Sequence, residues 1–353
     1  MPVKPVERTE SELACPGRIV AQDYVMSFVF ILPVLHPQKD SVSNYRHVEI
    51  ALKTTLDSLK QQTYDDIQII VVCCQVPDWS ATAGENVHFL DVSGAEAFAA
   101  NRNHYRVDIG MKFVLGALYA FEHFQCKLIM RADADDYVDI RVADYCVASM
   151  SKQLTNPEID GYIINKGLQV EVNLSPTEDF GFQRAYLVKR FNLSCGTCRI
   201  FKHESLKREI LKIDTAILTR STHWRSEAQR NVVHVPNELS KWLDDTCKAD
   251  YSADWHPINV LGRHIEQKKH FRFIPLPQLG AAKGCGHGNH VGVLEGRLHE
   301  DKIIGRIPVS LFKANFGISG KRAPGLGKLA DFLFKLSFHF SRLSKRLTRR
   351  RED

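Results

Sequence analysis

The sequence lacks an apolar run long enough to cross a membrane. Its longest such run, residues 24 to 35, is too short to span a bilayer and contains Pro33. An export signal is not expected either, because the first 23 residues place four acidic side chains where such a signal needs an uninterrupted apolar core. We therefore expect a cytoplasmic protein.

The sequence also lacks internal repeats and the cysteine pattern of a disulfide framework. Its nine cysteines are odd in number and scattered, and the adjacent Cys73 and Cys74 lie in an apolar stretch. This pattern suits reduced thiols in a core. The net charge is +6, but ten Lys and Arg lie from residue 321 onward against three acidic residues, so the rest of the chain is close to neutral.

Apolar runs of strand length alternate with helical patterns in the first part of the chain. Residues 28 to 35 are a continuous apolar run, 67 to 74 (IQIIVVCC) form a second strand-like stretch, and 87 to 92 form a shorter third. Such runs are typical of strands covered on both faces. Three- and four-residue apolar spacing predicts helices over 45 to 62 and 107 to 124. This alternation predicts an α/β fold, a mostly parallel sheet flanked by helices.

The pattern is less regular after residue 140. We expect a helix over 141 to 154, strands over 162 to 172, 195 to 201 and 271 to 276, and a Gly- and His-rich loop over 280 to 292.

The C-terminal residues have the pattern of a basic amphipathic helix. From residue 326, Leu and Phe recur at helical spacing opposite Lys and Arg. An anionic membrane surface suits such a helix better than nucleic acid, and packing onto the body is the alternative. We expect three parts: a flexible segment over 1–23, a body over 24–300 whose halves meet at residue 140, and this tail over 301–353.

The stretch LIMRADADDYV, residues 128 to 138, leads an apolar strand directly into Asp133, Asp135 and Asp136. Carboxylates this close repel one another, so we expect a cation among them. On an extended strand Asp133 and Asp135 point to the same side. A hard ion such as Mg²⁺ or Mn²⁺ takes one or two carboxylates and completes its shell with ligand phosphates. Alternatively, Asp135 or Asp136 caps the following helix.

Five segments resemble the nucleotide-sugar-binding half of family 2 glycosyltransferases of the GT-A fold. These are FVFILPVLHP, LKTTLDSLKQQTY, IQIIVV, DIGMKFVLGALYA and KLIMRADADDYV. The resemblance covers residues 26 to 140 and, more loosely, 194 to 290. It implies a GT-A (Rossmann-like) sheet.

The implied reaction is sugar transfer from a UDP-, GDP- or dTDP-linked donor to a hydroxyl of a glycan or lipid-linked acceptor. Cell-surface polysaccharide synthesis is the implied setting. We expect the chain at the cytoplasmic face of a membrane, held through residues 326–351, with no nucleic-acid partner.

The resemblance also assigns donor and metal ligands. Asp133 would contact the ribose or diphosphate, Asp135 would bind Mn²⁺ or Mg²⁺ with Asp133 beside it, and Pro33 would lie near the donor. Asp108 and Lys112 would lie near the nucleotide, with Lys112 on a phosphate. For this last pair, an ion pair on a helix surface is the alternative.

One departure concerns the nucleotide. Family members carry an acidic residue directly after the second strand, where this chain has Cys73, Cys74 and Gln75. Asp78, in the following loop, could substitute for it.

Inverting transfer needs a carboxylate that takes the proton of the acceptor hydroxyl. Asp254, in ADWHPINVLGRH, best matches the family's base, with Asp244 and Asp245 as the other candidates. Each of them could instead be a surface acid. In CGHGNH, His287 is expected on the metal or diphosphate, with His290 nearly equal.

Three other interpretations compete. The CGTC stretch, Cys195 to Cys198, could be a redox or zinc half-site, although it also resembles the family's acceptor-side strand. A phosphohydrolase of the haloacid dehalogenase type uses Asp-x-Asp after a strand, but Tyr137 stands where that family has Thr or Val. A non-catalytic membrane-surface module would act through the basic tail alone.

Overall fold

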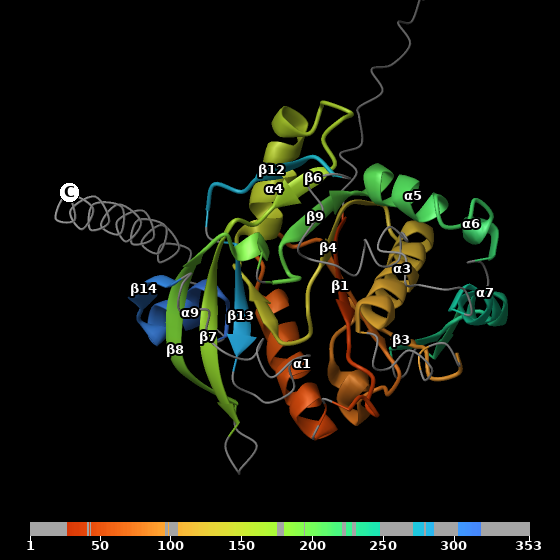
Figure 1. The fold of residues 1–353 in the computed structure, drawn as a ribbon, viewed down its shortest axis with the longest axis horizontal. Coiled ribbons are helices and arrows are strands. Elements are labelled where there is room, and N and C mark those ends of the chain that lie inside the picture. The colour runs from red at the N-terminus through yellow and green to blue at the C-terminus, as the bar shows by residue number, and fades with distance from the viewer. Residues whose placement is uncertain are drawn as a thin grey trace, which may run out of the picture.

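The computed structural model describes residues 27–318, apart from 41, 43, 96, 97, 99–104, 175–179, 194, 221–223, 228–230, 248–270, 279 and 286–302. These residues form two sheets and the helices that pack on them (Figure 1).

The larger sheet has nine strands among the described residues. They are β1 (Ser27–Pro33), β2 (Ile67–Cys73), β3 (Val87–Asp91), β4 (Cys126–Arg131), β6 (Gly161–Ile163), β9 (Arg199–Lys202), β10 (Arg225–Glu227), β11 (Val232–His234) and β12 (Phe273–Pro275). Their order is β10-β11-β3-β2-β1-β4-β9-β6-β12. The run from β11 to β4 is parallel throughout, and β9 pairs antiparallel with both neighbours.

The smaller sheet has five strands in the same part of the chain, in the order β14-β8-β7-β13-β5. They are β5 (Asp136–Val138), β7 (Lys166–Leu174), β8 (Phe180–Lys189), β13 (Ala281–Cys285) and β14 (Ile303–Ile307). The helices are α1 (Tyr45–Leu59), α3 (Tyr105–His123), α4 (Val142–Gln153), α5 (His203–Leu211), α6 (Ile217–Arg220), α7 (Asn237–Cys247) and α9 (Val309–Asn315), with short 3₁₀ turns η1 (Asp78–Thr82) and η2 (Phe191–Leu193).

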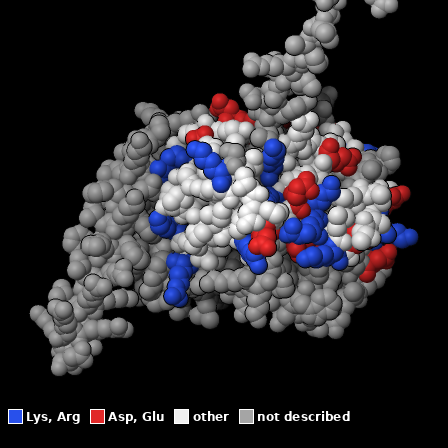
Figure 2. Space-filling view, turned by 90° about the horizontal axis from the view of Figure 1, so that it is seen from above, with Lys and Arg blue, Asp and Glu red and all other residues white. Residues whose placement is uncertain are grey.

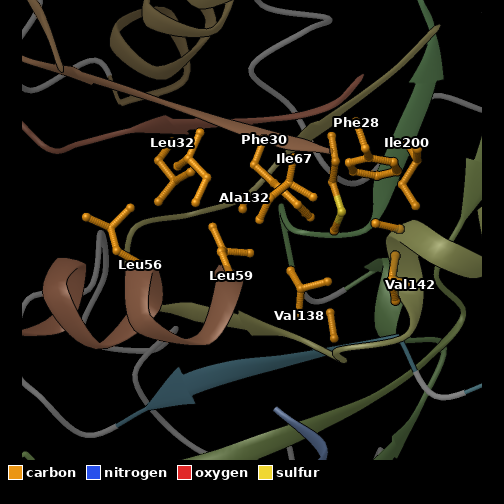
Figure 3. Packing of buried hydrophobic residues seen from close by; sticks show 14 of the residues in the cluster. Phe28, Phe30, Leu32, Leu56, Leu59, Ile67, Ala132, Val138, Val142 and Ile200 are labelled. Atoms are coloured by element: carbon orange, nitrogen blue, oxygen red, sulfur yellow. The ribbon is translucent and has the colours of Figure 1, made fainter. Parts of the chain in front are cut away.

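Alternate side chains of β1 face two separate cores. Phe28, Phe30 and Leu32 pack on one face with α1, while Val29 and Ile31 pack on the other with α3. Figure 3 shows Leu56 and Leu59 of α1 beneath Leu32 and Phe30, with Val138 of β5 and Val142 of α4 completing the layer. Fully burying one such side chain stabilises the fold by about 1.5–3 kcal/mol. The predicted α/β fold, a mostly parallel sheet flanked by helices, is confirmed and is consistent with a GT-A, Rossmann-like arrangement.

Two predicted elements are wrong. The strand expected over 162 to 172 is two strands in different sheets, β6 and β7, and the chain changes sheet at the polar residues Asn165 and Lys166. Residues 281 to 285, expected in a loop, form β13 between β7 and β5. Small residues suit this central position, since a Cβ at Gly284 would lie 2.5 Å from the Asp135 carbonyl oxygen.

Two further boundaries differ from the expectation. The strand predicted over 195 to 201 begins only at Arg199, and Cys195 to Cys198 precede it in a turn. The strand β14 and the helix α9 lie within the segment assigned to the tail, and Phe312 and Phe316 of that region are fully buried. The folded body therefore extends beyond residue 300.

The surface at the α4 and α5 end of the molecule carries charges of both signs (Figure 2). Ion pairs of residues on or next to α5 join Arg208 to Asp160, which precedes β6, at 2.6 Å and Lys212 to Glu209 at 2.6 Å. Within the described residues, no helix combines the length and apolar character that crossing a membrane requires. The basic tail over 326–351 lies outside the described residues.

Candidate functional site

The acidic turn, residues 133 to 136, follows β4 at the carboxyl edge of the parallel strands. The Ala132 N–H donates to the Ile31 carbonyl at 2.9 Å, so β1 holds the end of β4 in place. The Asp136 N–H then donates to the Asp133 carbonyl at 3.1 Å and closes the turn. From α1, Thr55 Oγ1 donates to the Ala134 carbonyl at 3.0 Å. Ligands of open α/β sheets bind beyond this edge.

The cation expected beside the carboxylates is partly supplied by the chain itself. Arg131 Nη2 and Nε lie 2.8 and 3.2 Å from Asp133 Oδ1. The Arg131 side chain is 2% exposed and that of Asp133 is 28% exposed. A charge-assisted hydrogen bond of this kind fixes the carboxylate and offsets its charge. Asp133 is therefore oriented by Arg131 while part of it still faces solvent.

The third carboxylate, Asp136, is fully buried. Burial raises the pKa of Asp136 well above its ordinary value, and the nearby Asp135 and Asp133 raise it further. Its Oδ2 accepts hydrogen bonds from Cys195 Sγ at 2.8 Å and Thr197 Oγ1 at 2.6 Å. A raised pKa favours the neutral carboxylic acid, which removes one of the mutually repelling charges.

Asp135 is half-buried and lies in the turn itself. Since β4 ends at Arg131, the extended-strand geometry that would align Asp135 with Asp133 does not apply, which corrects that expectation. Within the described residues, no group of three or more His, Cys, Asp or Glu side chains could hold a metal ion. Asp133 and Asp135 are ligands of the type that a hard divalent ion takes, and Mg²⁺ commonly uses only one or two carboxylates and completes its shell with phosphate and water.

The structure places Asp108 and Lys112 beneath the edge rather than on it. Both side chains are 0% exposed, and Lys112 Nζ lies 2.7 Å from Asp108 Oδ1. The same ammonium donates to the Val34 carbonyl at 2.7 Å and lies 5.3 Å from the centre of the Phe98 ring. Burial lowers the pKa of Lys112, but Asp108, Cys74 and Cys73 together outweigh burial and the net pKa is raised. This corrects both expectations: the pair is neither a helix-surface pair nor open to a phosphate.

The other donor candidates lie at the same edge with different exposure. Pro33 is the last residue of β1 and is buried, while Asp78 begins η1 and is exposed.

A cavity of about 220 Å³, which the sequence did not predict, opens at the ends of β2, β3 and β11. Its lining consists of Cys74, Val76, Asp91, Ser93, Glu227, Val232 and His234.

Two carboxylates of this cavity hold His234. Its Nε2 is 2.9 Å from Glu227 Oε1, and its Nδ1 is 3.7 Å from Asp91 Oδ2. Asp91 is aligned with Cys73 in the parallel pairing of β3 with β2. An acid at the end of the third strand was therefore a second candidate beside Asp78, and the sequence patterns did not single it out.

Within the described residues, the structure does not place a candidate base next to the acidic turn. Asp244 and Asp245 lie on α7, which packs through Leu239 and Leu243 into the core that contains α3. Figure 1 places α7 at the β3 side of the molecule, apart from β13. Asp254, His287 and His290 lie outside the described residues. β13 ends at Cys285, two residues before His287, and its Lys283 is aligned with Asp136.

Comparisons with known proteins give only distant likenesses. No family model matches the chain, and no curated protein matches it. A structure of S. aureus TarS in complex with UDP has 15% identity and a TM-score of 0.28, covering 60% of this chain and 58% of its own. The match spans 35% of another, longer TarS chain.

A mannose-1-phosphate geranyltransferase from Thermus thermophilus has 12% identity and a TM-score of 0.32, covering 64% of this chain and 80% of its own. Mannose-6-phosphate isomerase from Helicobacter pylori has 13% identity and a TM-score of 0.31, with 71% and 97% covered. Likenesses this weak leave function to be argued from the site.

Proposed function

We propose that the chain is a glycosyltransferase that moves a sugar from a nucleotide-diphosphate donor to a hydroxyl of a glycan or lipid-linked acceptor. The observation that carries this proposal is the acidic turn. It leaves Asp133 and Asp135 partly exposed at the carboxyl edge of a parallel sheet, next to the strand β1. Two carboxylates at this edge suit a divalent ion that also binds a diphosphate.

Asp135 and Asp133 would hold Mn²⁺ or Mg²⁺, with His287 as a further ligand. Such an ion supplies Lewis-acid stabilisation of the departing diphosphate. Arg131 keeps Asp133 in a fixed orientation in the absence of a ligand, so less ordering remains to be done on binding.

We place the nucleoside end of the donor beside Asp91. This carboxylate stands at the end of the strand next to β2, where the acid expected after β2 is replaced by Cys74. Asp91 also borders the cavity, whereas Asp78 points from an exposed 3₁₀ turn.

For transfer itself, Asp254 is the proposed base that takes the acceptor proton, with inversion at the sugar. The position of α7 favours Asp254 over Asp244 and Asp245. The phosphohydrolase alternative would need the first aspartate as a free nucleophile, but Arg131 holds Asp133.

Titration of the purified chain with UDP, GDP and dTDP, with and without Mn²⁺, tests the proposal. One nucleotide should bind more tightly than the others, and Mn²⁺ should strengthen its binding. The variant Asp135→Asn should lose the Mn²⁺-dependent part, while Asp144→Asn, an exposed carboxylate on α4, should keep it. Equal weak binding of all three nucleotides without any metal effect would contradict the proposal.

Membrane attachment through residues 326–351, at the cytoplasmic face, is a second part of the proposal. Removal of residues 321 to 353 should abolish binding to anionic vesicles and leave Mn²⁺-dependent nucleotide binding intact. Loss of both vesicle binding and nucleotide binding would favour a membrane-surface module in place of the transferase.

A further inference from the structure

One hydroxyl is hydrogen-bonded to both ends of the acidic turn. Thr197 Oγ1 accepts the Asp133 N–H at 2.7 Å and donates to Asp136 Oδ2 at 2.6 Å. The Thr197 side chain is fully buried. Asp135 lies between these two anchored residues, so the direction of its side chain depends on the backbone that Thr197 holds.

The residues before Thr197 are packed against the same turn. Cys195 Sγ donates to Asp136 Oδ2, the oxygen that Thr197 also contacts. At Gly196, a Cβ would lie 2.3 Å from Arg131 Nη2 and 2.4 Å from Asp133 Oδ2. No side chain fits there unless the Arg131–Asp133 pair moves, so the Cys195–Thr197 stretch and the pair are in direct contact.

The two hydrogen bonds of Thr197 connect segments that are far apart in the chain. Thr197 is separated from Asp133 by 64 residues and from Asp136 by 61 residues. β4 pairs antiparallel with β9, which begins two residues after Thr197, and this pairing delivers the hydroxyl to the turn. The resemblance placed this stretch on the acceptor side, whereas the structure places it under the carboxylates of the donor side.

We propose that Thr197 is a positioning residue for the metal and diphosphate site: its hydroxyl sets the backbone of the acidic turn so that Asp133 and Asp135 address the same ligand. This inference rests on the proposed function. Groups that orient metal ligands through hydrogen bonds typically change metal affinity about 10- to 100-fold when they are removed.

The test compares Thr197→Val, which removes the hydroxyl, with Thr197→Ser, which keeps it. Thr63→Val is the control, because Thr63 Oγ1 also makes a long-range hydrogen bond, to the Ile140 carbonyl at 3.1 Å, and Thr63 makes none with the acidic turn. For each variant, the nucleotide that the unmodified chain binds best is titrated in Mn²⁺ and again in EDTA. Thermal unfolding is recorded in parallel.

We expect Thr197→Val to weaken the Mn²⁺-dependent binding about 10- to 100-fold and to leave the affinity in EDTA unchanged. Thr197→Ser and Thr63→Val should bind as the unmodified chain does. Equal binding by Thr197→Val would overturn the inference and leave the proposed function standing. A Thr197→Ser variant as weak as Thr197→Val would also overturn it, because the hydroxyl alone would then not restore the site.

A second pair of variants covers the case in which Thr197→Val does not fold. Cys195→Ala removes the other donor to Asp136, and Cys146→Ala removes a buried thiol outside this network. Weaker Mn²⁺-dependent binding by Cys195→Ala alone supports the inference, and equal binding by both variants contradicts it. Absence of Mn²⁺-dependent binding in the unmodified chain would remove the proposed function and this inference together.

Discussion

Two acid–base pairs lie near the carboxyl ends of neighbouring strands, and they differ in access to solvent. Asp108 and Lys112 are both 0% exposed, whereas Asp133 is 28% exposed beside the buried Arg131. The Lys112 ammonium also donates a hydrogen bond to the Val34 carbonyl, so both of these partners lie inside the fold. Asp133 keeps a solvent-facing side. Of the two pairs, only the one at Asp133 has a carboxylate that a ligand from solvent can reach.

Breaking the buried pair should give the largest effect on stability. Lys112→Met leaves Asp108 charged and without its partner, which should lower the free energy of unfolding by about 3–5 kcal/mol. Urea denaturation measures this loss. The control Lys60→Met breaks the exposed pair with Asp57 and should cost about 0–1 kcal/mol.

A double replacement sharpens this prediction. Asp108→Leu together with Lys112→Met removes both charges, and most of the lost stability should return. A double variant as unstable as Lys112→Met would show that packing, and not charge, dominates at this position.

A half-buried histidine provides the second test. Burial, together with His123, lowers the pKa of His88 from 6.5 to about 4. The unfolded chain therefore takes up this proton near pH 6.5 and the folded chain only near pH 4, so acid favours unfolding between these values. The share from His88 amounts to about 3 kcal/mol at most.

Urea denaturation of His88→Gln between pH 7 and pH 4 checks the sign. The variant should lose less stability than the unmodified chain as the pH falls. His47→Gln, outside the aromatic cluster around His88, should follow the unmodified chain. A steeper loss in His88→Gln would contradict the assignment.

An added methyl group beside the Arg131–Asp133 pair should have a moderate effect on stability. A methyl group at Gly196 would overlap Arg131 and Asp133, so Gly196→Ala should cost about 1–3 kcal/mol and weaken Mn²⁺-dependent nucleotide binding. Gly94→Ala is the control, since nothing lies within 4 Å of its added Cβ. Unchanged binding by Gly196→Ala would show that Asp133 tolerates displacement.

The smallest effect on stability is expected at Asp135. Asp135→Asn should change the free energy of unfolding by less than about 0.5 kcal/mol, because the side chain is half-exposed and keeps its shape. Its effect should appear in ligand binding alone. A loss of stability as large as that of Lys112→Met would show that Asp135 stabilises the fold, as the Asp108–Lys112 pair does.

The parallel strands could be predicted because the sequence of each strand by itself indicates that the strand is buried. β1 and β2 are mostly apolar runs of strand length, a pattern that predicts a buried strand without reference to its neighbours. β13 could not be predicted in the same way. Its sequence AAKGC is short of typical strand residues, and it is a strand through its pairing with β7 and β5, which its own sequence does not indicate.

Part of the site was predictable from spacing. Arg131 is the last residue of β4 and Asp133 follows two residues later, so the sequence itself places a basic side chain close to this acidic one. An external cation was expected here, and this internal one was not predicted. The contacts of Thr197 and Cys195 with Asp136 depend on strand pairing across about 60 residues, and local patterns carry no information on such pairing.

The strand order also determines how long the edge of a newly synthesised strand stays unpaired before the neighbouring strand is made. β3 is made early, but β11, which covers its edge, is encoded about 140 residues later, and β9 reaches β4 about 70 residues after it. At ribosomal speeds of about 5–20 residues per second, the β3 edge stays uncovered for on the order of ten seconds. An uncovered apolar edge invites pairing with other chains, so nascent copies of this protein should depend on chaperones until residue 234 has emerged.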